Sequence, residues 1–246
     1  MIWTIARHEW RRLHSAITFW LLLAFAQLLI AWLAFAQLET FATIAPQLTA
    51  AGAPLSAMDL VVVPTFNSLV LLLLLAAPLL AMGSLAGEVR SGRIALWLAA
   101  PVAALRIVAG KVIGLWLALL PPLATCMLTL AALGLAIEID PTRFVLAAAM
   151  LAVFTLWLSC MGVFLSSLFD HPAAALAACY GILLFLWLLD SLSGSQAAWS
   201  WWALLPHLEP AFDGLLRSQD IVFFVASGAA AWLLAGYRVA RRRGEL

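Results

Sequence analysis

Six long stretches of the chain contain no charged side chain, and this pattern restricts the fold more than any other feature of the sequence. A helix needs roughly 20 apolar residues, within a range of about 17 to 25, to cross about 30 Å of hydrocarbon. Of the 246 residues, 66% are hydrophobic and 10% are charged, which leaves too little polar surface to coat a water-soluble globule. The sequence therefore predicts an all-α membrane protein with six transmembrane helices. The charge-free stretches are residues 16–38, 60–87, 112–137, 144–169, 172–189 and 221–237.

The expected spans belong to a single transmembrane domain of residues 1–246. Their predicted bounds are about 16–38, 64–86, 108–137, 144–168, 173–190 and 220–238. All three cysteines lie inside these spans and form no C-x-x-C pair. We interpret them as packing residues and expect no metal site.

The basic residues are divided unevenly between the connecting segments. Six spans place both termini on one side, together with the segments between spans two and three and between spans four and five. That side carries 11 of the 13 Lys and Arg, whereas Arg143 and Arg217 lie on the other side. Lys and Arg accumulate in cytoplasmic loops, so both termini are expected in the cytoplasm. The 11 residues are Arg7, Arg11, Arg12, Arg90, Arg93, Arg106, Lys111, Arg238, Arg241, Arg242 and Arg243.

Catalytic and nucleotide-binding motifs are missing from the sequence. The predicted spans contain no histidine, and neither G-x-S-x-G nor H-E-x-x-H occurs. A phosphate-binding loop is also missing, because Gly110-Lys111 is followed by Val112 and no glycine stands five residues earlier. The charge-free stretches lack the ionisable groups that ion-driven transporters place at membrane depth. We expect that this chain is not an enzyme by itself, binds no nucleic acid, and receives any energy of ATP hydrolysis from another chain.

The first residues have the pattern of an amphipathic helix. Apolar residues recur at helical spacing, and basic residues fall on a different face. Such a helix lies among the lipid headgroups. A simple basic flank with tryptophans at the membrane interface is the alternative. The apolar face is Trp3, Ala6, Trp10 and Leu13, and the basic face is Arg7, Arg11 and His14.

Residues 87–101 form the longest segment between two spans on the basic side. Charged residues come first, an apolar run follows, and Pro101 ends it. This order favours a short helix held against the membrane surface, where a soluble partner could bind. An ordinary solvated loop is the alternative.

Several short motifs of the sequence stand out: Arg7-x-Glu9 ahead of Ser15, Glu88-x-Arg90-Ser91-Gly92, Ala100-Pro101-Val102, Ile107-Val108-x-Gly110-Lys111, the run 162–168, Pro206-His207-Leu208 and the run 212–224. Together they resemble the motifs of ABC-2 type permeases, the membrane subunits of one class of ABC transporters, and within them the gliding-motility permease branch. Arg93 and Ala16 depart from the family, which usually has threonine and proline there. Asp213 and Arg217 exchange the family's basic and acidic residues, and on a helix they would still pair at i and i+4.

The resemblance implies a permease that binds a cytoplasmic ABC ATPase, which would carry ATP and Mg²⁺, while this chain binds no cofactor. It further implies a coupling helix between spans two and three, a second permease copy or a sister subunit, surrounding membrane lipid, a periplasmic accessory subunit and a location in the bacterial inner membrane. Residues 199–219 would form short re-entrant helices on the outer side, for which an anchored loop without a gating role is the alternative. The implied ATPase-coupling residues are Glu88, Arg90, Gly92 and Arg93; the N-terminal interfacial helix offers Trp3, Arg7, Trp10 and Arg11; the outer gate is Pro206, His207, Phe212, Gly214 and Asp220.

The leading hypothesis is the permease subunit of an ATP-driven exporter. One alternative is a membrane anchor or assembly subunit of a cell-envelope machine that moves no solute. Another is a permease for haem-related or metal-related export with the same architecture. A membrane-embedded enzyme ranks last, since the sequence offers no catalytic constellation.

Overall fold

The computed structural model describes residues 1–51, 56–99, 101–192 and 201–244, and these residues are helical with no strand. Six helices are long and apolar enough to cross a membrane, which confirms the predicted fold class. The six are α2 (Ile17–Ala51), α3 (Val63–Ala81), α6 (Ala104–Leu133), α7 (Pro141–Leu168), α8 (Pro172–Leu192) and α10 (Ser218–Arg243). The short elements are α1 (Ile2–His14), the π-helical turn η1 (Met58–Val62), α4 (Ala86–Arg90), α5 (Ile94–Ala99), the 3-10 turn η3 (Leu205–His207) and α9 (Glu209–Phe212).

The helices extend beyond several of the apolar stretches that reveal them. Helix α2 continues past Glu39 to Ala51 with Pro46 inside it, although the predicted span ends at residue 38. Helix α6 begins at Ala104, so Lys111 is inside it. Hydrophobic pattern marks the part of a helix that crosses lipid, whereas the helix continues until a residue or a turn interrupts its hydrogen bonds.

Helix α7 lies at the centre of the bundle and packs against α3, α6, α8 and α10. Large side chains that are fully buried, among them Phe66, Phe154 and Phe224, fill the space between these helices. Gly162 of α7 lets α3 approach closely, because an added Cβ would lie 2.5 Å from Cβ of Ala81. Lipid is as apolar as leucine, so such close packing, and not exclusion from water, holds spanning helices together.

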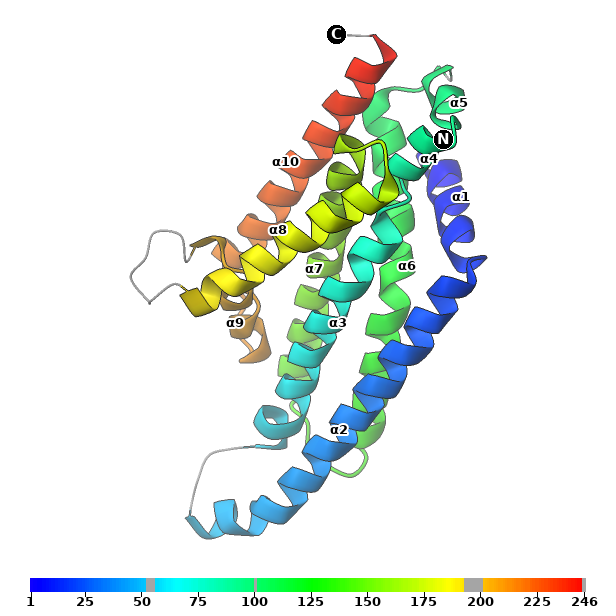
Figure 1. The fold of residues 1–246 in the computed structure, drawn as a ribbon. Helices are drawn as coiled ribbons and strands as arrows, with labels where there is room; N and C mark the ends of the chain where they lie inside the picture. The colour runs from blue at the N-terminus through cyan, green and yellow to red at the C-terminus, as the bar shows by residue number, and fades with distance from the viewer. Residues whose placement is uncertain (52–55, 100, 193–200, 245–246) are drawn as a thin grey trace.

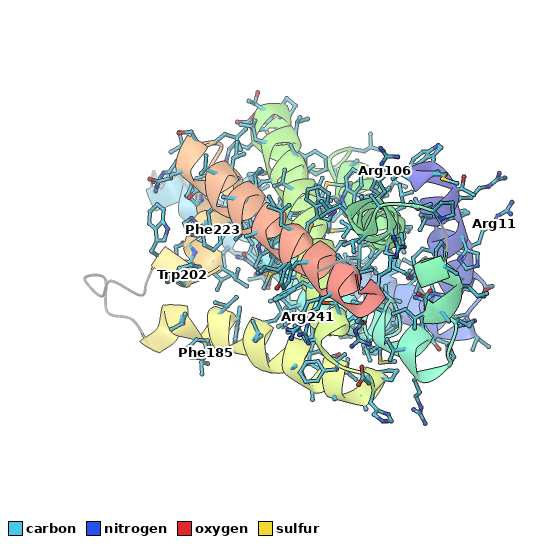
Figure 2. All side chains as sticks on the ribbon, turned by 90° about the horizontal axis from the view of Figure 1, so that it is seen from above. Arg11, Arg106, Phe185, Trp202, Phe223 and Arg241 are labelled. Atoms are coloured by element: carbon cyan, nitrogen blue, oxygen red, sulfur yellow. The ribbon has the colours of Figure 1, made fainter. Side chains whose placement is uncertain are left out.

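Helices α2 and α8 lie at the edge of the bundle. Only 22% of the residues in the most apolar part of each are buried, compared with 61% for the span that contains α3. Seen from above, α8 stands to one side and Phe185 points away from the other helices (Figure 2). Both helices therefore present wide apolar faces to the membrane or to a neighbouring chain.

Both termini lie at the same end of the bundle, together with α1, α4 and α5 (Figure 1). Helix α6 begins at this end and α10 finishes there, so it carries the 11 basic residues named above. We call it the basic end. The end of α2, η1 and the connection between α6 and α7 lie at the opposite end (Figure 1).

Candidate functional site

A helical hairpin made by α4 and α5 projects from the basic end (Figure 1). Its turn ends α4 at Ser91, whose N–H donates to the carbonyl of Gly87, and Gly92 follows with φ of 72°. Glycine adopts this left-handed conformation without steric cost and commonly ends helices in this way. The E-x-R-S-G motif is therefore the sequence that forms the hairpin turn.

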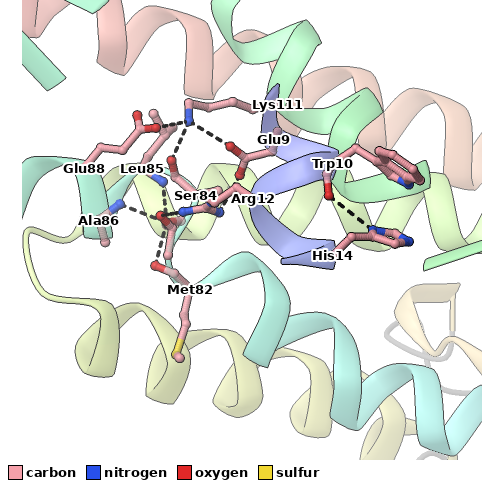
Figure 3. Close-up of polar contacts among 12 residues, drawn as sticks. Glu9, Trp10, Arg12, His14, Met82, Ser84, Leu85, Ala86, Glu88 and Lys111 are labelled. Atoms are coloured by element: carbon pink, nitrogen blue, oxygen red, sulfur yellow. Dashed lines mark hydrogen bonds and ion pairs between the residues drawn. The ribbon is translucent and has the colours of Figure 1, made fainter. Parts of the chain in front are cut away.

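Four charged side chains from α1, α4 and α6 meet beneath the hairpin, and we call them the charged cluster: Glu9, Arg12, Glu88 and Lys111 (Figure 3). Lys111 Nζ donates to Glu88 Oε1 at 2.7 Å, to the carbonyl of Ser84 at 2.7 Å and to Glu9 Oε2 at 3.4 Å. Arg12 donates to Glu9 Oε1 at 2.6 Å and to the carbonyl of Gly83 at 2.7 Å.

Three of the four side chains in the charged cluster are almost completely shielded from water. The side chain of Lys111 is 0% exposed, and those of Glu9 and Glu88 are 2% and 3% exposed. A buried charge is tolerated only when it is paired and hydrogen-bonded, and removal of one partner leaves an uncompensated charge. The two cations and two carboxylates compensate one another, so the cluster fixes α1 and α4 to the start of α6.

The turn between α3 and α4 is held by a serine from α7. The hydroxyl of Ser166 accepts hydrogen bonds from the N–H groups of Leu85 and Ala86 and donates to the carbonyl of Met82. A buried turn needs partners for its free backbone groups, and Ser166 supplies three of them. The base of the hairpin is thus joined to the central helix as well as to α6.

Two glycines on α6 form the seat of α1. An added Cβ at Gly110 would lie 2.6 Å from Cβ of Ile5, and one at Gly114 would lie 2.6 Å from Cβ of Glu9. Small residues four positions apart let two helix backbones approach closely. The G-K-V-I-G sequence of 110–114 therefore brings α1 near enough for Glu9 to reach Lys111.

A hollow of about 340 Å³ lies between α1 and the hairpin. It is lined by His8, Arg12, Glu88, Arg93, Leu96 and Trp97. The ring of Trp97 lies 5.6 Å from Lys111 Nζ, and Arg243 from the end of α10 donates to the carbonyls of Trp97 and Val102. The rim of this hollow is basic and open to solvent, so it suits a partner with acidic side chains.

The four predicted coupling residues separate into two groups. Arg90, Gly92 and Arg93 are exposed at the tip of the hairpin. Glu88 is buried in the charged cluster and cannot present its carboxylate to a soluble partner, because Lys111 and the surrounding helices cover it. Its part in any coupling is to position the hairpin.

The predicted N-terminal helix is present, but it is rotated relative to the face that its tryptophans suggest. The buried stripe is Ile5, Ala6, Glu9 and Leu13. Trp3 and Trp10 are exposed beside this stripe, and Arg7 and Arg11 are exposed further round. The glutamate is buried in place of the tryptophans because a lysine on α6 pairs with it, which sequence periodicity cannot reveal.

At the opposite end of α10, residues 205–217 fold back against the bundle. His207 Nδ1 lies 2.7 Å from Asp220 Oδ1, and its ring stacks on Phe223 with centroids 4.1 Å apart. The carbonyl of Trp201 lies 2.9 Å from Nε2. Both ring nitrogens of His207 thus face an oxygen atom, and the ring connects the folded-back segment to α10.

Arg143, from the start of α7, ties the same segment to η1. It donates to Asp59 at 2.8 Å and to the carbonyl of Phe212 at 3.2 Å, and it lies 3.5 Å from Asp213. Gly214 has φ of 84°, and a Cβ there would lie 2.9 Å from Cγ of Arg143.

The expected helical pair of Asp213 and Arg217 is wrong. Helix α9 ends at Phe212 and α10 begins at Ser218, so no helix contains both residues. The positive φ of Gly214 interrupts the helix between them. Asp213 faces Arg143 instead.

The remaining predicted gate residues lie in this folded-back segment. Pro206 is in η3, and the buried Phe212 packs against Phe66 with ring centroids 5.6 Å apart. Trp199 and the other residues of 193–200 lie outside the described residues. In the part of the chain that the structure describes, no group of three His, Cys, Asp or Glu side chains could hold a metal ion.

Sequence reasoning missed Glu9, Lys111, Ser166 and Arg143 as members of these sites. The sequence did offer one signal for this site, the lysine inside the predicted span of residues 108–137. A charged Lys111 would be costly there without partners. Nothing in the sequence identified Glu9 and Glu88 as those partners, since they lie 102 and 23 residues away from Lys111.

Residues 3–200 match the family model described as ABC-2 family transporter protein. The match includes α1, the hairpin and the whole charged cluster, whereas residues 201–246, with η3, α9 and α10, lie beyond it. No curated protein matches the chain.

Proposed function

The chain belongs to the ABC-2 transporter family, and from this premise we propose that it is the permease subunit of an ABC exporter, driven by a separate ATPase that binds at the basic end. Six apolar helices and the family make it a multi-pass membrane permease. The direction of transport rests on the resemblance to the ABC-2 permeases described above.

The charged cluster is the observation that carries this proposal. It joins two surface elements, α1 and the α4–α5 hairpin, to the start of a 30-residue spanning helix through buried ion pairs. A push on the hairpin either moves α6 or separates charges in a dry site, which is costly. Such a connection suits a subunit whose work is delivered from outside the bilayer.

The basic end faces the cytoplasm in this proposal. Eleven of the 13 Lys and Arg lie there, and only Arg143 and Arg217 lie elsewhere. Positive residues in short loops remain on the cytoplasmic side during insertion. The ATPase, which needs cytoplasmic ATP and Mg²⁺, would therefore meet the hairpin directly.

Arg90 and Arg93 form the contact surface, and Glu88 and Lys111 hold it in place. Both arginines are exposed, and Arg93 lines the hollow between α1 and the hairpin. Opposite charges across an interface speed association, whereas like charges brought together cost several kcal/mol. An acidic surface on the ATPase would complement this rim.

Charge reversal tests the docking surface. We expect Arg90→Glu with Arg93→Glu to lower the amount of co-purified ABC ATPase about tenfold or more, since roughly 1.4 kcal/mol of lost binding suffices for that change. The measurement is ATPase recovered with the tagged chain and its rate of hydrolysis in vesicles. The purified chain alone should hydrolyse no ATP.

Arg217→Glu is the matched control, because Arg217 is an exposed arginine outside the basic end. It should leave ATPase recovery unchanged. Undiminished recovery with the double variant would exclude the hairpin as the contact, and hydrolysis by the chain alone would exclude a partner-driven permease.

A further inference from the structure

An apolar crevice runs between α2, α3 and α6 on the side of the bundle that carries α2. Twelve side chains line it, and none is polar: Phe19, Leu22, Leu23, Ala26, Leu69, Leu72, Leu73, Ala76, Leu80, Ala118, Leu119 and Pro122. Along α3 the lining extends from Leu69 to Leu80, roughly 16 Å at about 1.5 Å per residue. One leaflet of a bilayer has about the same depth, half of roughly 30 Å.

The crevice adjoins a second hollow at the basic end, since Phe19 and Leu80 line both. This hollow has a volume of about 220 Å³, and Arg12 and Thr18 are the polar side chains of its mostly apolar lining. The crevice itself offers only about 20 Å³, so it is shallow. Four of its lining residues are partly exposed and form a slot that an alkyl chain can lie along, with the wider compartment at one end: Leu22, Leu23, Leu72 and Ala76.

Arg12 supplies a cation at that compartment. Its side chain is 24% exposed, and its two terminal nitrogens donate to Gly83 and Glu9. Each terminal nitrogen of a guanidinium carries two hydrogens, so one on each is left for a further acceptor. Phosphate oxygens match this fork of donors.

The local charge favours an anion. The partner of Arg12, Glu9, is also drawn toward Lys111. Among the described residues of α1 and the charged cluster, the cations are Arg7, Arg11, Arg12 and Lys111, and the carboxylates are Glu9 and Glu88, which leaves a surplus of two positive charges.

The tryptophans place the compartment at the level of the lipid headgroups. Trp20 donates from Nε1 to the carbonyl of His14, and the rings of Trp10 and Trp20 are exposed on either side of this point. Exposed tryptophans concentrate at the membrane interface. Arg12 and Thr18 therefore lie at headgroup depth, and the apolar slot begins beside them at Phe19.

From these observations we propose that the groove of α2, α3 and α6 binds one phospholipid of the leaflet at the basic end, with an acyl chain in the slot and its phosphate on Arg12. The lipid completes the packing of α2, of which little is buried against protein. This site is independent of the ATPase and of the direction of transport.

Photolabelling in a bilayer of defined composition tests the site. The full chain is reconstituted in phosphatidylcholine with a small fraction of phosphatidylglycerol that carries a diazirine on its acyl chain, and labelled peptides are identified by mass spectrometry. We expect at least threefold more label on the groove residues of α2 and α3 than on the exposed faces of α8 and α10. Equal labelling of all exposed faces would overturn the proposal, because it would show only surrounding bulk lipid.

Two pairs of variants separate the slot from the headgroup compartment. Ala76→Phe fills the slot and should lower groove labelling more than twofold, whereas Ala124→Phe, on an exposed face of α6 away from the crevice, should not change it. Arg12→Gln should lower the retention of phosphatidylglycerol measured by native mass spectrometry, and Arg12→Lys should restore much of it.

A second copy of the chain is the rival occupant of the groove. Ala76→Cys should form no disulfide between copies under oxidising conditions if lipid covers the slot. An efficient cross-link there, or unchanged labelling in both Ala76→Phe and Arg12→Gln, would overturn the proposal. Melting temperatures close to that of the unmodified chain establish that the variants are folded.

Discussion

The two ends of the bundle secure their surface segments in different ways. At the basic end, the charged cluster joins residues from three helices, and its longest link spans 102 positions in the sequence. At the opposite end, the buried pair of His207 and Asp220 links residues only 13 positions apart. The hairpin is thus fixed to α6 by buried charged side chains, whereas the folded-back segment is held to α10 by one buried polar pair and to α7 by Arg143, whose side chain is 21% exposed.

This difference determines how each end should respond when its surface segment is displaced. Displacement of the hairpin has to move α6 or break buried ion pairs, so the basic end is suited to transmit a movement. The opposite segment is held by the pair of His207 and Asp220, by the contacts of Arg143 with Phe212 and Asp213, and by the packing of Phe212 on Phe66. Of these polar contacts only the first joins two buried side chains, so we expect this segment to separate from the bundle at a lower cost than the hairpin.

The largest effect is expected at Lys111. Lys111→Met leaves Glu88 buried without a cation and Glu9 with Arg12 alone, and it should lower the free energy of unfolding by about 3–5 kcal/mol. Thermal unfolding in detergent micelles measures the loss. Adding Glu88→Gln to this variant should restore part of the stability, because Glu9 still pairs with Arg12 and no buried carboxylate is then left without a cation. An unchanged melting temperature for Lys111→Met would mean that the cluster does not hold the basic end.

A smaller and more local effect is expected at Asp220. Asp220→Ala removes the acceptor from a buried ring N–H and should cost about 1–3 kcal/mol. Hydrogen exchange should quicken in residues 201–217 and change little in the hairpin. Asp220→Asn keeps an acceptor oxygen, so its stability should lie between those of the unmodified chain and Asp220→Ala. Faster exchange at the basic end as well would show that the two ends are not held separately.

The smallest effect is expected at Arg143. Its side chain is 21% exposed and that of Asp59 is 30% exposed, so the pair should contribute about 0.2–1 kcal/mol. A double-mutant cycle with Arg143→Ala and Asp59→Ala, read from thermal unfolding at low and high salt, measures the coupling. A coupling free energy larger than the stability lost in Asp220→Ala would mean that Arg143, and not the His207 and Asp220 pair, is the stronger attachment at the opposite end.

The sequence predicted the spans far better than it predicted their contacts. Runs without charge identified six helices because lipid excludes charged side chains, and the part of the chain that the structure describes contains six helices of this kind. The position of α1 was not predictable in the same way, since its buried face holds Glu9 and not Trp3 or Trp10. Periodicity treats a glutamate as solvent-exposed unless a partner from elsewhere in the chain is known.

The candidate site was predicted in outline and changed in detail. The motif of residues 88–92 marked a segment between two spans for which a short helix was expected, and in the structure the segment is a hairpin whose turn contains Gly92 at positive φ. The inward direction of Glu88 depended on Lys111 and Ser84, which reach it only after α3 and α6 have packed. Likewise, the adjacency of His207 and Asp220 required the segment between them to fold back.

By itself the sequence determined what is local or is imposed by the lipid: the number of helices, the excess of arginine and lysine at one end, and the glycine turns. Membrane insertion and backbone sterics act on short stretches of chain, so their effects can be predicted from the local sequence. Only the tertiary structure decided which buried charges compensate one another and which groove is left beside α2. Those outcomes depend on distances between helices far apart in the sequence, and close packing of Gly110 and Gly114 against α1 sets those distances at the basic end.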